Sequence, residues 1–316
     1  MFMEEISLHN SLGDVQIDAV VGEVIRVYES AFPGQIAGYY VEGSYADRTQ
    51  LATSDIDLVL VFRQPFAHEE ERKAAEQAWD RHNHGSTLEV DIVLTNEQEL
   101  HDGVNPNVKM GSLFVYGEDV CHRYPIVPIE SWTSERMHAS YWLLVNVYQR
   151  PKPVQLMLDF PDPVDEFYGY TNRTIHLPDG REVPCTRNLV RTTGWAATAL
   201  LALQARQYAA KKRACVQLYR EHIGDEWTSL LEEIETFCRD TWQYLIPDEP
   251  AAREHLRAIC ARTLLFERHF LVLYKDYLLR QFHTTNQEQL TRAFWVQDQS
   301  PLADEEVAAA RQMAYQ

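Results

Sequence analysis

Two acidic residues, separated by one position, stand at the start of an apolar run. Asp55 and Asp57 flank Ile56, and residues 56–62 are otherwise apolar and rich in β-branched side chains. Such a run is typical of a buried strand. Side chains alternate along a strand, so Asp55 and Asp57 point the same way. Two carboxylates at the mouth of an apolar strand are costly without a positive partner, and a divalent cation is the commonest one, so the pattern indicates a metal site.

A Gly-Ser pair precedes this segment by ten residues. Gly43 and Ser44 follow residues 36–42, which are apolar up to Val41 and are expected to form another strand. A glycine at a strand end lets the backbone approach a phosphate closely. The Ser44 hydroxyl and the N–H groups after it, at the start of a short helix, can hold phosphate oxygens. The pair therefore predicts a phosphate-binding turn.

A third acidic segment lies at residues 88–94, which again read as a strand. Glu89 and Asp91 are two positions apart there and share a face. Three acidic positions on apolar strands need a positive charge partner. The alternative, in which Asp55 and Asp57 are solvated residues at a strand end, is therefore disfavoured.

These motifs together resemble the nucleotidyltransferase superfamily that includes DNA polymerase β, poly(A) polymerases and the antibiotic nucleotidyltransferases. Its signature is a hydrophobic strand, Gly-Ser, about ten residues, Asp-x-Asp on a strand, and a carboxylate on a later strand. The run from Lys109 to Asp119, which ends in Tyr116-Gly117-Glu118-Asp119, is similar to one that closes the catalytic domain in aminoglycoside nucleotidyltransferases. The layout is nearest to the streptomycin/spectinomycin type, which implies an α+β fold: an N-terminal mixed-sheet domain followed by a C-terminal helical bundle.

The resemblance assigns roles to particular residues. Asp55, Asp57 and Asp91 would hold Mg²⁺, with two ions in all, and Gly43 and Ser44 would bind the nucleoside triphosphate. Glu89 would be the general base; the reverse assignment of Glu89 and Asp91 stays open, because the streptomycin type uses the Glu of a Leu-Glu-Val run. Lys212 would contact the nucleotide, since those proteins often begin a bundle helix with a Ser-Lys pair at this place.

The implied reaction moves a nucleoside monophosphate, with ATP as the first candidate donor, to a hydroxyl of a small cationic molecule such as an aminoglycoside. Pyrophosphate is released. A protein side chain or a tRNA end is the alternative acceptor, as in toxin-type relatives. A nucleotide-binding module without catalysis is a third possibility, against which the retained acidic residues and Ser44 count.

Composition and charge limit the classes of binding partner and the cellular environment that we expect for this protein. The chain has 316 residues, 45% of them hydrophobic, enough for two folded domains. The net charge of −18 disfavours long nucleic acids and favours a cationic small molecule. Five scattered cysteines predict neither a disulfide framework nor a zinc site. No secretory signal and no apolar stretch of membrane-spanning length is present, so a cytoplasmic protein without a membrane partner is expected.

The spacing of apolar residues along the sequence predicts three regions. Residues 1–130 are expected to be the catalytic domain, and 131–283 an acceptor-binding bundle with a hairpin around Asp179-Gly180. Residues 284–316 read as an acidic tail, apart from a helix at about 304–312. Two basic features stay open between a structural and a functional role. One is Lys109, and the other is a cluster that could be a solvated connection or a triphosphate clamp: Arg206, Lys211, Lys212, Arg213 and Arg220.

Overall fold

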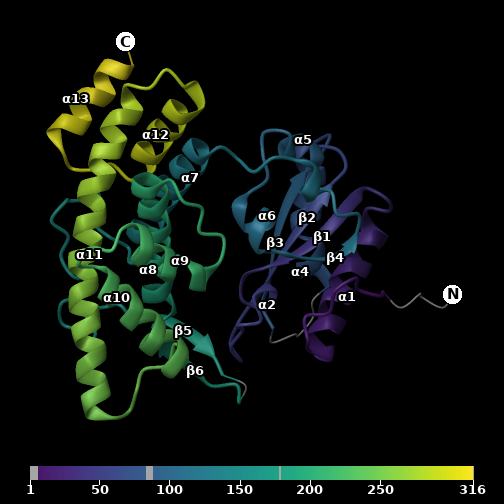
Figure 1. Ribbon diagram of the computed structural model, residues 1–316, viewed down its shortest axis with the longest axis horizontal. Coiled ribbons are helices and arrows are strands. Elements are labelled where there is room, and N and C mark those ends of the chain that lie inside the picture. The colour runs from purple at the N-terminus through teal and green to yellow at the C-terminus, as the bar shows by residue number, and fades with distance from the viewer. Residues whose placement is uncertain (1–5, 83–87, 178, 316) are drawn as a thin grey trace. The chain divides into compact units, whose positions relative to one another are not determined.

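The structure, a computed structural model, describes residues 6–82, 88–177 and 179–315, which form two compact units (Figure 1). The first unit consists of Met1–Pro128 together with Ala210–Lys212. The second consists of Ile129–Ala209 and Arg213–Gln316. After residues 129–209 of the second unit, the chain therefore returns to the first unit for the three residues 210–212.

A four-stranded mixed sheet forms the centre of the first unit (Figure 1). β1 (Ile36–Glu42) pairs antiparallel with β2 (Ile56–Phe62) and with β4 (Leu113–Gly117). β2 pairs parallel with β3 (Val90–Asn96), so the strand order is β3-β2-β1-β4. The expected mixed sheet, in an α+β fold with a C-terminal helical region, is confirmed.

The two central strands are covered on both faces, which explains their nearly continuous apolar sequence. On one face, Leu58 and Leu60 belong to a core that includes Val24 and Tyr28 of α1 (Val15–Ala31). On the other face, Tyr40 of β1 and Val59 of β2 pack with residues that follow β3 and β4. The remaining elements are short: α2 (Gly43–Ala46), α3 (Glu69–Glu76), α4 (Ala78–His82), α5 (Glu97–Leu100), α6 (Pro106–Gly111) and the 3₁₀ turn η1 (Cys121–Arg123).

Helices dominate the second unit (Figure 1). Its longest helix, α11 (Pro250–Phe282), is buried along one side and belongs to a core shared with the other helices. The predicted hairpin is present as β5 (Arg173–His176) and β6 (Glu182–Cys185). The other elements up to α11 are α7 (Ile129–Val147), α8 (Arg187–Leu200), the π-helical turn η2 (Leu201–Ala205), α9 (Lys212–His222), α10 (Thr228–Glu233) and the π-helical η3 (Ile234–Thr241).

The C-terminal residues differ from the expected acidic tail. They form α12 (Gln287–Gln299) and α13 (Glu305–Ala314), which pack on α11. α13 is the helix expected at about 304–312, whereas α12 was not expected. Asn286 and Asp304 cap these helices by accepting hydrogen bonds from backbone N–H groups in their first turns. The physical reason for the difference is burial in the bundle core of apolar residues that stand far apart in a polar sequence: Ala293, Val296, Leu302, Val307 and Ala310.

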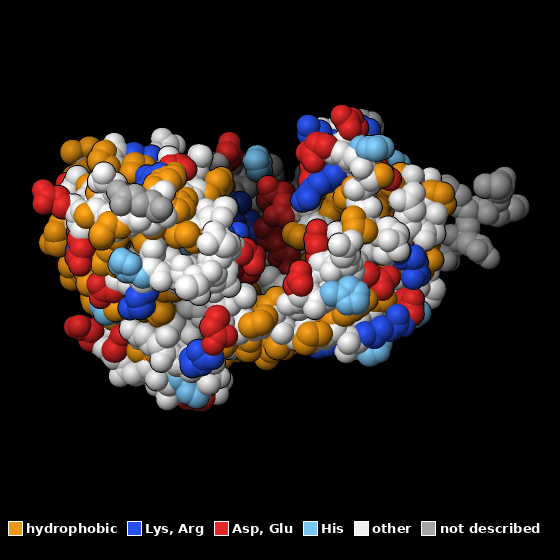
Figure 2. Space-filling model, turned by 90° about the horizontal axis from the view of Figure 1, so that it is seen from above, with side chains coloured by type: hydrophobic (Ala, Val, Ile, Leu, Met, Phe, Trp, Pro, Cys, Tyr) orange, Lys and Arg blue, Asp and Glu red, His pale blue; other side chains and the backbone are white. Residues whose placement is uncertain are grey.

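The distribution of charged side chains and the state of the cysteines are those expected for a folded, acidic chain. On the face drawn in Figure 2, acidic and basic side chains are interspersed with apolar ones on both units. All five cysteines are buried and free, in accord with their scattered spacing. Among the residues that the structure describes, no helix combines the length and apolar composition that a bilayer crossing requires.

Candidate active site

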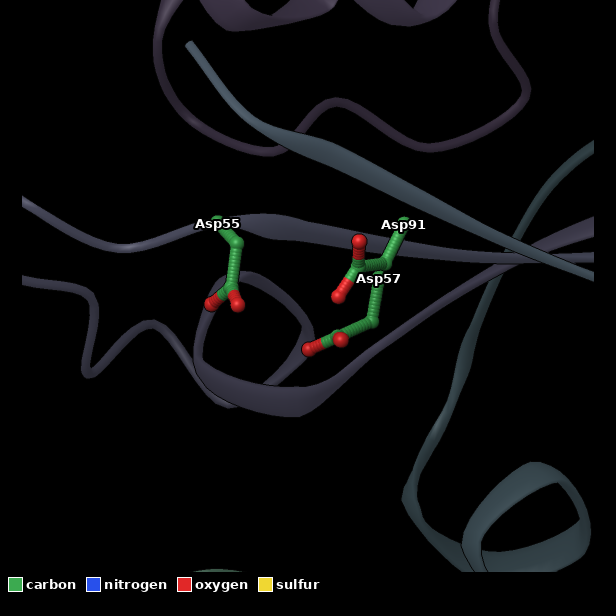
Figure 3. Close-up of side chains that lie close together, drawn as sticks. All are labelled: Asp55, Asp57 and Asp91. Carbon is green, nitrogen blue, oxygen red and sulfur yellow. The ribbon is translucent and has the colours of Figure 1, made fainter. Parts of the chain in front are cut away.

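Three carboxylates meet at one end of the sheet (Figure 3). One oxygen each of Asp55, Asp57 and Asp91 lies within 4.8 Å of the others. Asp57 and Asp91 are direct partners across the parallel pair β2 and β3. Asp55 precedes Asp57 by two positions, and Figure 3 shows its carboxylate on the same side of the strands. The pairing register thus brings together two acidic segments that lie far apart in the sequence.

The donor set fits a hard divalent cation. Carboxylate oxygens are the ligands that Mg²⁺ prefers, and it usually keeps several positions for water and phosphate oxygens. Asp55 and Asp57 are half-buried, whereas Asp91 is exposed on the edge strand β3, so the group is open to solvent on one side. Three like charges this close repel one another, and a bound cation would remove that cost. Metal binding by these residues stays a prediction.

Gly43 lies directly against this carboxylate group. Its φ of +69° is in the left-handed region, which favours glycine. A Cβ at this position would clash with Oδ2 of Asp57. Ser44 follows as a buried residue in the first turn of α2. The Gly-Ser turn therefore adjoins the Asp57 carboxylate, and its phosphate-binding role stays a prediction.

A buried tyrosine that the motifs do not reveal supports the turn. Tyr45, the residue after Ser44, is almost fully buried in the core of the first unit. Burial raises the pKa of its hydroxyl, and the negative charges of Asp14 and Asp55 raise it further. Tyr45 thus keeps its proton and adds no charge beside the carboxylates. Only its place between Ser44 and Asp55 in the sequence could have suggested this role.

The structure separates Glu89 from Asp91. Glu89 stands just before β3, where its carbonyl oxygen accepts a hydrogen bond of 3.0 Å from the Ile56 N–H. Its side chain is exposed and is not part of the group formed by Asp91 and the two aspartates around Ile56. This geometry supports Asp91 as the metal ligand and leaves Glu89 available as a base; both roles stay predictions.

Lys109 has a structural role. Its Nζ donates hydrogen bonds to the carbonyl oxygens of Cys121 (2.7 Å), His122 (3.0 Å) and Tyr124 (2.7 Å). These carbonyls belong to η1 and the residue after it, so the ammonium group holds the turn that follows β4. All three ammonium protons have acceptors, and Lys109 is therefore not a nucleotide ligand in this structure.

The basic cluster is divided among separate ion pairs. Arg206 pairs with Glu130 at 2.6 Å, Lys211 with Asp47 at 2.7 Å, and Arg213 with Asp240 at 2.9 Å; Arg220 pairs with Glu232. These four side chains use four different acidic partners, which favours the solvated connection over a shared clamp. Lys212 begins α9, and its side chain lies outside the described part of the chain.

Comparison with known families identifies the class of this fold and site. Residues 22–114 match the model of the nucleotidyltransferase domain. The matched range contains Gly43, Ser44 and the three clustered aspartates. This part of the chain is a nucleotidyltransferase domain, and the protein is an enzyme of the nucleotidyltransferase class.

Two solved structures are similar to the chain. One is a candidate nucleotidyltransferase from Sulfolobus solfataricus, with 24% identity over 32% of this chain and 79% of that one, and a TM-score of 0.25. The other is the spectinomycin adenyltransferase AAD(9) from Enterococcus faecialis, solved with ATP and spectinomycin. It has 13% identity over 82% of this chain and 99% of that one, and a TM-score of 0.46. No curated protein sequence matches the chain. Because both TM-scores lie below 0.5, the class rests on the domain match.

Proposed function

We propose that this nucleotidyltransferase requires Mg²⁺ and transfers the nucleoside monophosphate of an NTP, with ATP as the first candidate, to a hydroxyl of a small cationic molecule. The acceptor oxygen attacks the α-phosphorus, the bond from this phosphorus to the β-phosphate oxygen breaks, and pyrophosphate leaves. The observation that carries the proposal is the convergence of Asp55, Asp57 and Asp91 beside the Gly43-Ser44 turn.

Each residue has a distinct part in this proposal. Asp55, Asp57 and Asp91 would hold two Mg²⁺ ions. When bound, these ions neutralise the triphosphate and lower the pKa of the acceptor hydroxyl. Gly43 lets the backbone approach the phosphates, and the Ser44 hydroxyl donates to one of their oxygens. Glu89 takes the acceptor proton, and Lys212 contacts the triphosphate.

The charge of the chain supports the choice of acceptor. A net charge of −18 attracts a cation such as an aminoglycoside and repels the phosphates of tRNA. The same charge does not discriminate against a protein side chain. A protein acceptor is therefore the second outcome that the assay has to resolve.

The test is transfer by the purified protein with Mg²⁺ and each NTP in turn, against a panel of aminoglycosides and lincosamides. Pyrophosphate release gives the rate, and the product mass gives the transferred group. The Asp57→Asn variant is the blank, because it loses one carboxylate from the proposed metal group. Release at the level of this blank with every small acceptor would refute a small-molecule enzyme, and a mass increase on added protein would establish the alternative.

Ser44→Ala tests the phosphate turn separately. The Ser44 hydroxyl would contact phosphates that are bound in the ground state and in the transition state alike. Its loss should therefore raise the KM for NTP more than it lowers kcat. Steady-state kinetics with NTP as the varied substrate measure both constants, and a loss confined to kcat contradicts this role.

A further inference from the structure

The segment 210–212 belongs to the first unit, although the residues on both sides of it in the chain belong to the second. It follows a backbone reversal at Arg206, which ends η2 with a φ of +53°. It leads directly into α9, whose first residue is Lys212. Two contacts with the first unit hold this short segment, and they use different physical interactions.

The first contact is an ion pair at the Gly-Ser turn. Nζ of Lys211 lies 2.7 Å from Oδ1 of Asp47, whose side chain is only 13% exposed. Asp47 is the C-cap residue of α2, and its N–H donates to the Gly43 carbonyl oxygen at 3.2 Å. Asp47 is thus fixed to the turn that carries Ser44, and Lys211 is fixed to Asp47.

The second contact is a close backbone approach. Gly111 is the last residue of α6, and a Cβ built on it would lie 2.8 Å from the carbonyl oxygen of Ala210. The φ of Gly111 lies outside the left-handed region, so its lack of a side chain serves this approach and not a strained backbone. α6 also packs against α2. Ala210 and Lys211 are therefore held by two neighbouring elements of the first unit.

We propose that Asp47 and Gly111 are positioning residues: they hold residues 210–211 against α2 and α6, within the first unit, and so fix the Gly-Ser turn for the triphosphate of the nucleotide. This inference rests on the proposed function. Asp47 neutralises the charge of Lys211, so Lys211 anchors the segment and is not itself a phosphate ligand. The docking restricts the Gly-Ser turn before the nucleotide arrives, which reduces the ordering cost of binding.

Two variants undo the docking in different ways. Asp47→Asn removes the charge partner of Lys211, and Gly111→Ala inserts a methyl group where the Ala210 carbonyl lies. An exposed or half-exposed ion pair contributes up to about 1 kcal/mol, so we expect each variant to raise the KM for NTP about two- to fivefold with a smaller change in kcat. Two variants serve as matched controls, and neither should change KM: Lys275→Gln, which loses a 2.7 Å pair with Asp304, and Gly194→Ala, a helical glycine with nothing within 4 Å of its Cβ position.

A charge swap separates anchoring from direct phosphate contact. The double variant Asp47→Lys with Lys211→Asp restores the pair with opposite polarity. If Lys211 is an anchor, the swap should bring the KM for NTP back to within about twofold of the wild-type value. If the double variant binds NTP more weakly than either single variant, Lys211 contacts the phosphates and the inference is overturned.

Hydrogen exchange without nucleotide tests the docking independently of activity. Amides of residues 206–214 should exchange faster in Asp47→Asn and Gly111→Ala than in the wild type, and at the wild-type rate in Lys275→Gln. Unchanged exchange in both variants overturns the docking. Faster exchange with an unchanged KM overturns its positioning role. Faster exchange in a protein that transfers no nucleotide refutes the proposed function and leaves the docking of the segment supported.

Discussion

Neutralising Asp57 should stabilise the protein in the absence of metal while removing its response to Mg²⁺. Asp57 follows Asp55 by two positions and is the partner of Asp91 across the pair of β2 and β3. One oxygen of each of the three residues lies within 4.8 Å of the others. Asp57→Asn keeps the size of the side chain and removes one of the three charges. The metal-free protein loses two repulsive interactions, and the metal-bound protein loses an anionic ligand.

The magnitude follows from the separation of the charges. Two unit charges 4.8 Å apart repel by about 0.9 kcal/mol in water and by about 3.5 kcal/mol at an effective dielectric constant of 20. Asp57 has two such neighbours and the group is open to solvent, so the water-like value applies to each. We therefore expect Asp57→Asn to raise the free energy of unfolding by about 2 kcal/mol in a chelator. Binding at ten times the Mg²⁺ Kd stabilises the wild type by about 1.4 kcal/mol, and the variant should lack this gain.

Calorimetric unfolding in EDTA and at rising Mg²⁺ concentration measures both effects. Glu89→Gln is the matched control, because it removes one exposed negative charge near the same strand but outside the clustered group. Its free energy of unfolding should change by less than about 0.5 kcal/mol, and it should keep the Mg²⁺ response. An Asp57→Asn protein that gains as much from Mg²⁺ as the wild type would refute the idea that these carboxylates share a cation. One that is less stable in EDTA would contradict the calculated repulsion.

The remaining predictions concern catalysis, backbone geometry and pH. Asp91→Asn should weaken Mg²⁺ and nucleotide binding together, with partial rescue by excess Mg²⁺. Glu89→Gln should keep both affinities and lower kcat by about 10²–10⁴-fold, less so at high pH; titration and kinetics that show the exchanged pattern reverse the two roles. Gly43→Ala should abolish transfer, because its Cβ displaces the adjacent carboxylate. The control is Gly34→Ala, which has a similar φ of +68° but open space around its Cβ position, and it should cost only about 1–2 kcal/mol of stability. Equal losses of activity by the two variants in a transfer assay would contradict this. Burial, reinforced by the charge of Arg292, lowers the pKa of His138 to about 3, so the fold holds this histidine neutral and is destabilised as pH falls below the unfolded pKa of about 6.5. Between pH 7 and 5 the loss should be about 2 kcal/mol in urea unfolding, and a His138→Gln variant with the same loss would disprove the assignment.

Local patterns were sufficient to predict the elements of the site. Alternation along a strand placed Asp55 and Asp57 on one side, and the apolar run after them predicted the central strand β2. The partner of each strand is not a local property. The sequence could not tell whether Glu89 or Asp91 stands opposite Asp57, because a one-residue shift of a strand reverses the face of every side chain and a two-residue shift exchanges the two acids. The parallel register of β2 and β3 places Asp91 there.

Contacts between residues far apart in the sequence also explain why the roles of the basic residues stayed open and why the C-terminal region was predicted to be a tail. Arg206 forms an ion pair with Glu130, and Arg213 forms one with Asp240. No pattern of sequence spacing predicts these two pairs. Lys109 is held by carbonyl groups that carry no sequence signal at all. The helices after residue 286 pack with few apolar residues each, so their contribution to the core becomes visible only when α11 lies beside them.

The return of the chain to the first unit also has a consequence for synthesis on the ribosome. Residues 210–212 are added only after all of 129–209, which takes on the order of 4 to 16 s at roughly 5–20 residues per second. During this interval the sheet and the Gly-Ser turn can fold, yet Asp47 has no Lys211 to bind and the space over Gly111 is unfilled. A nascent chain released at residue 128 therefore carries the three aspartates without the whole of their own unit. Completion of the first unit thus depends on synthesis of much of the second.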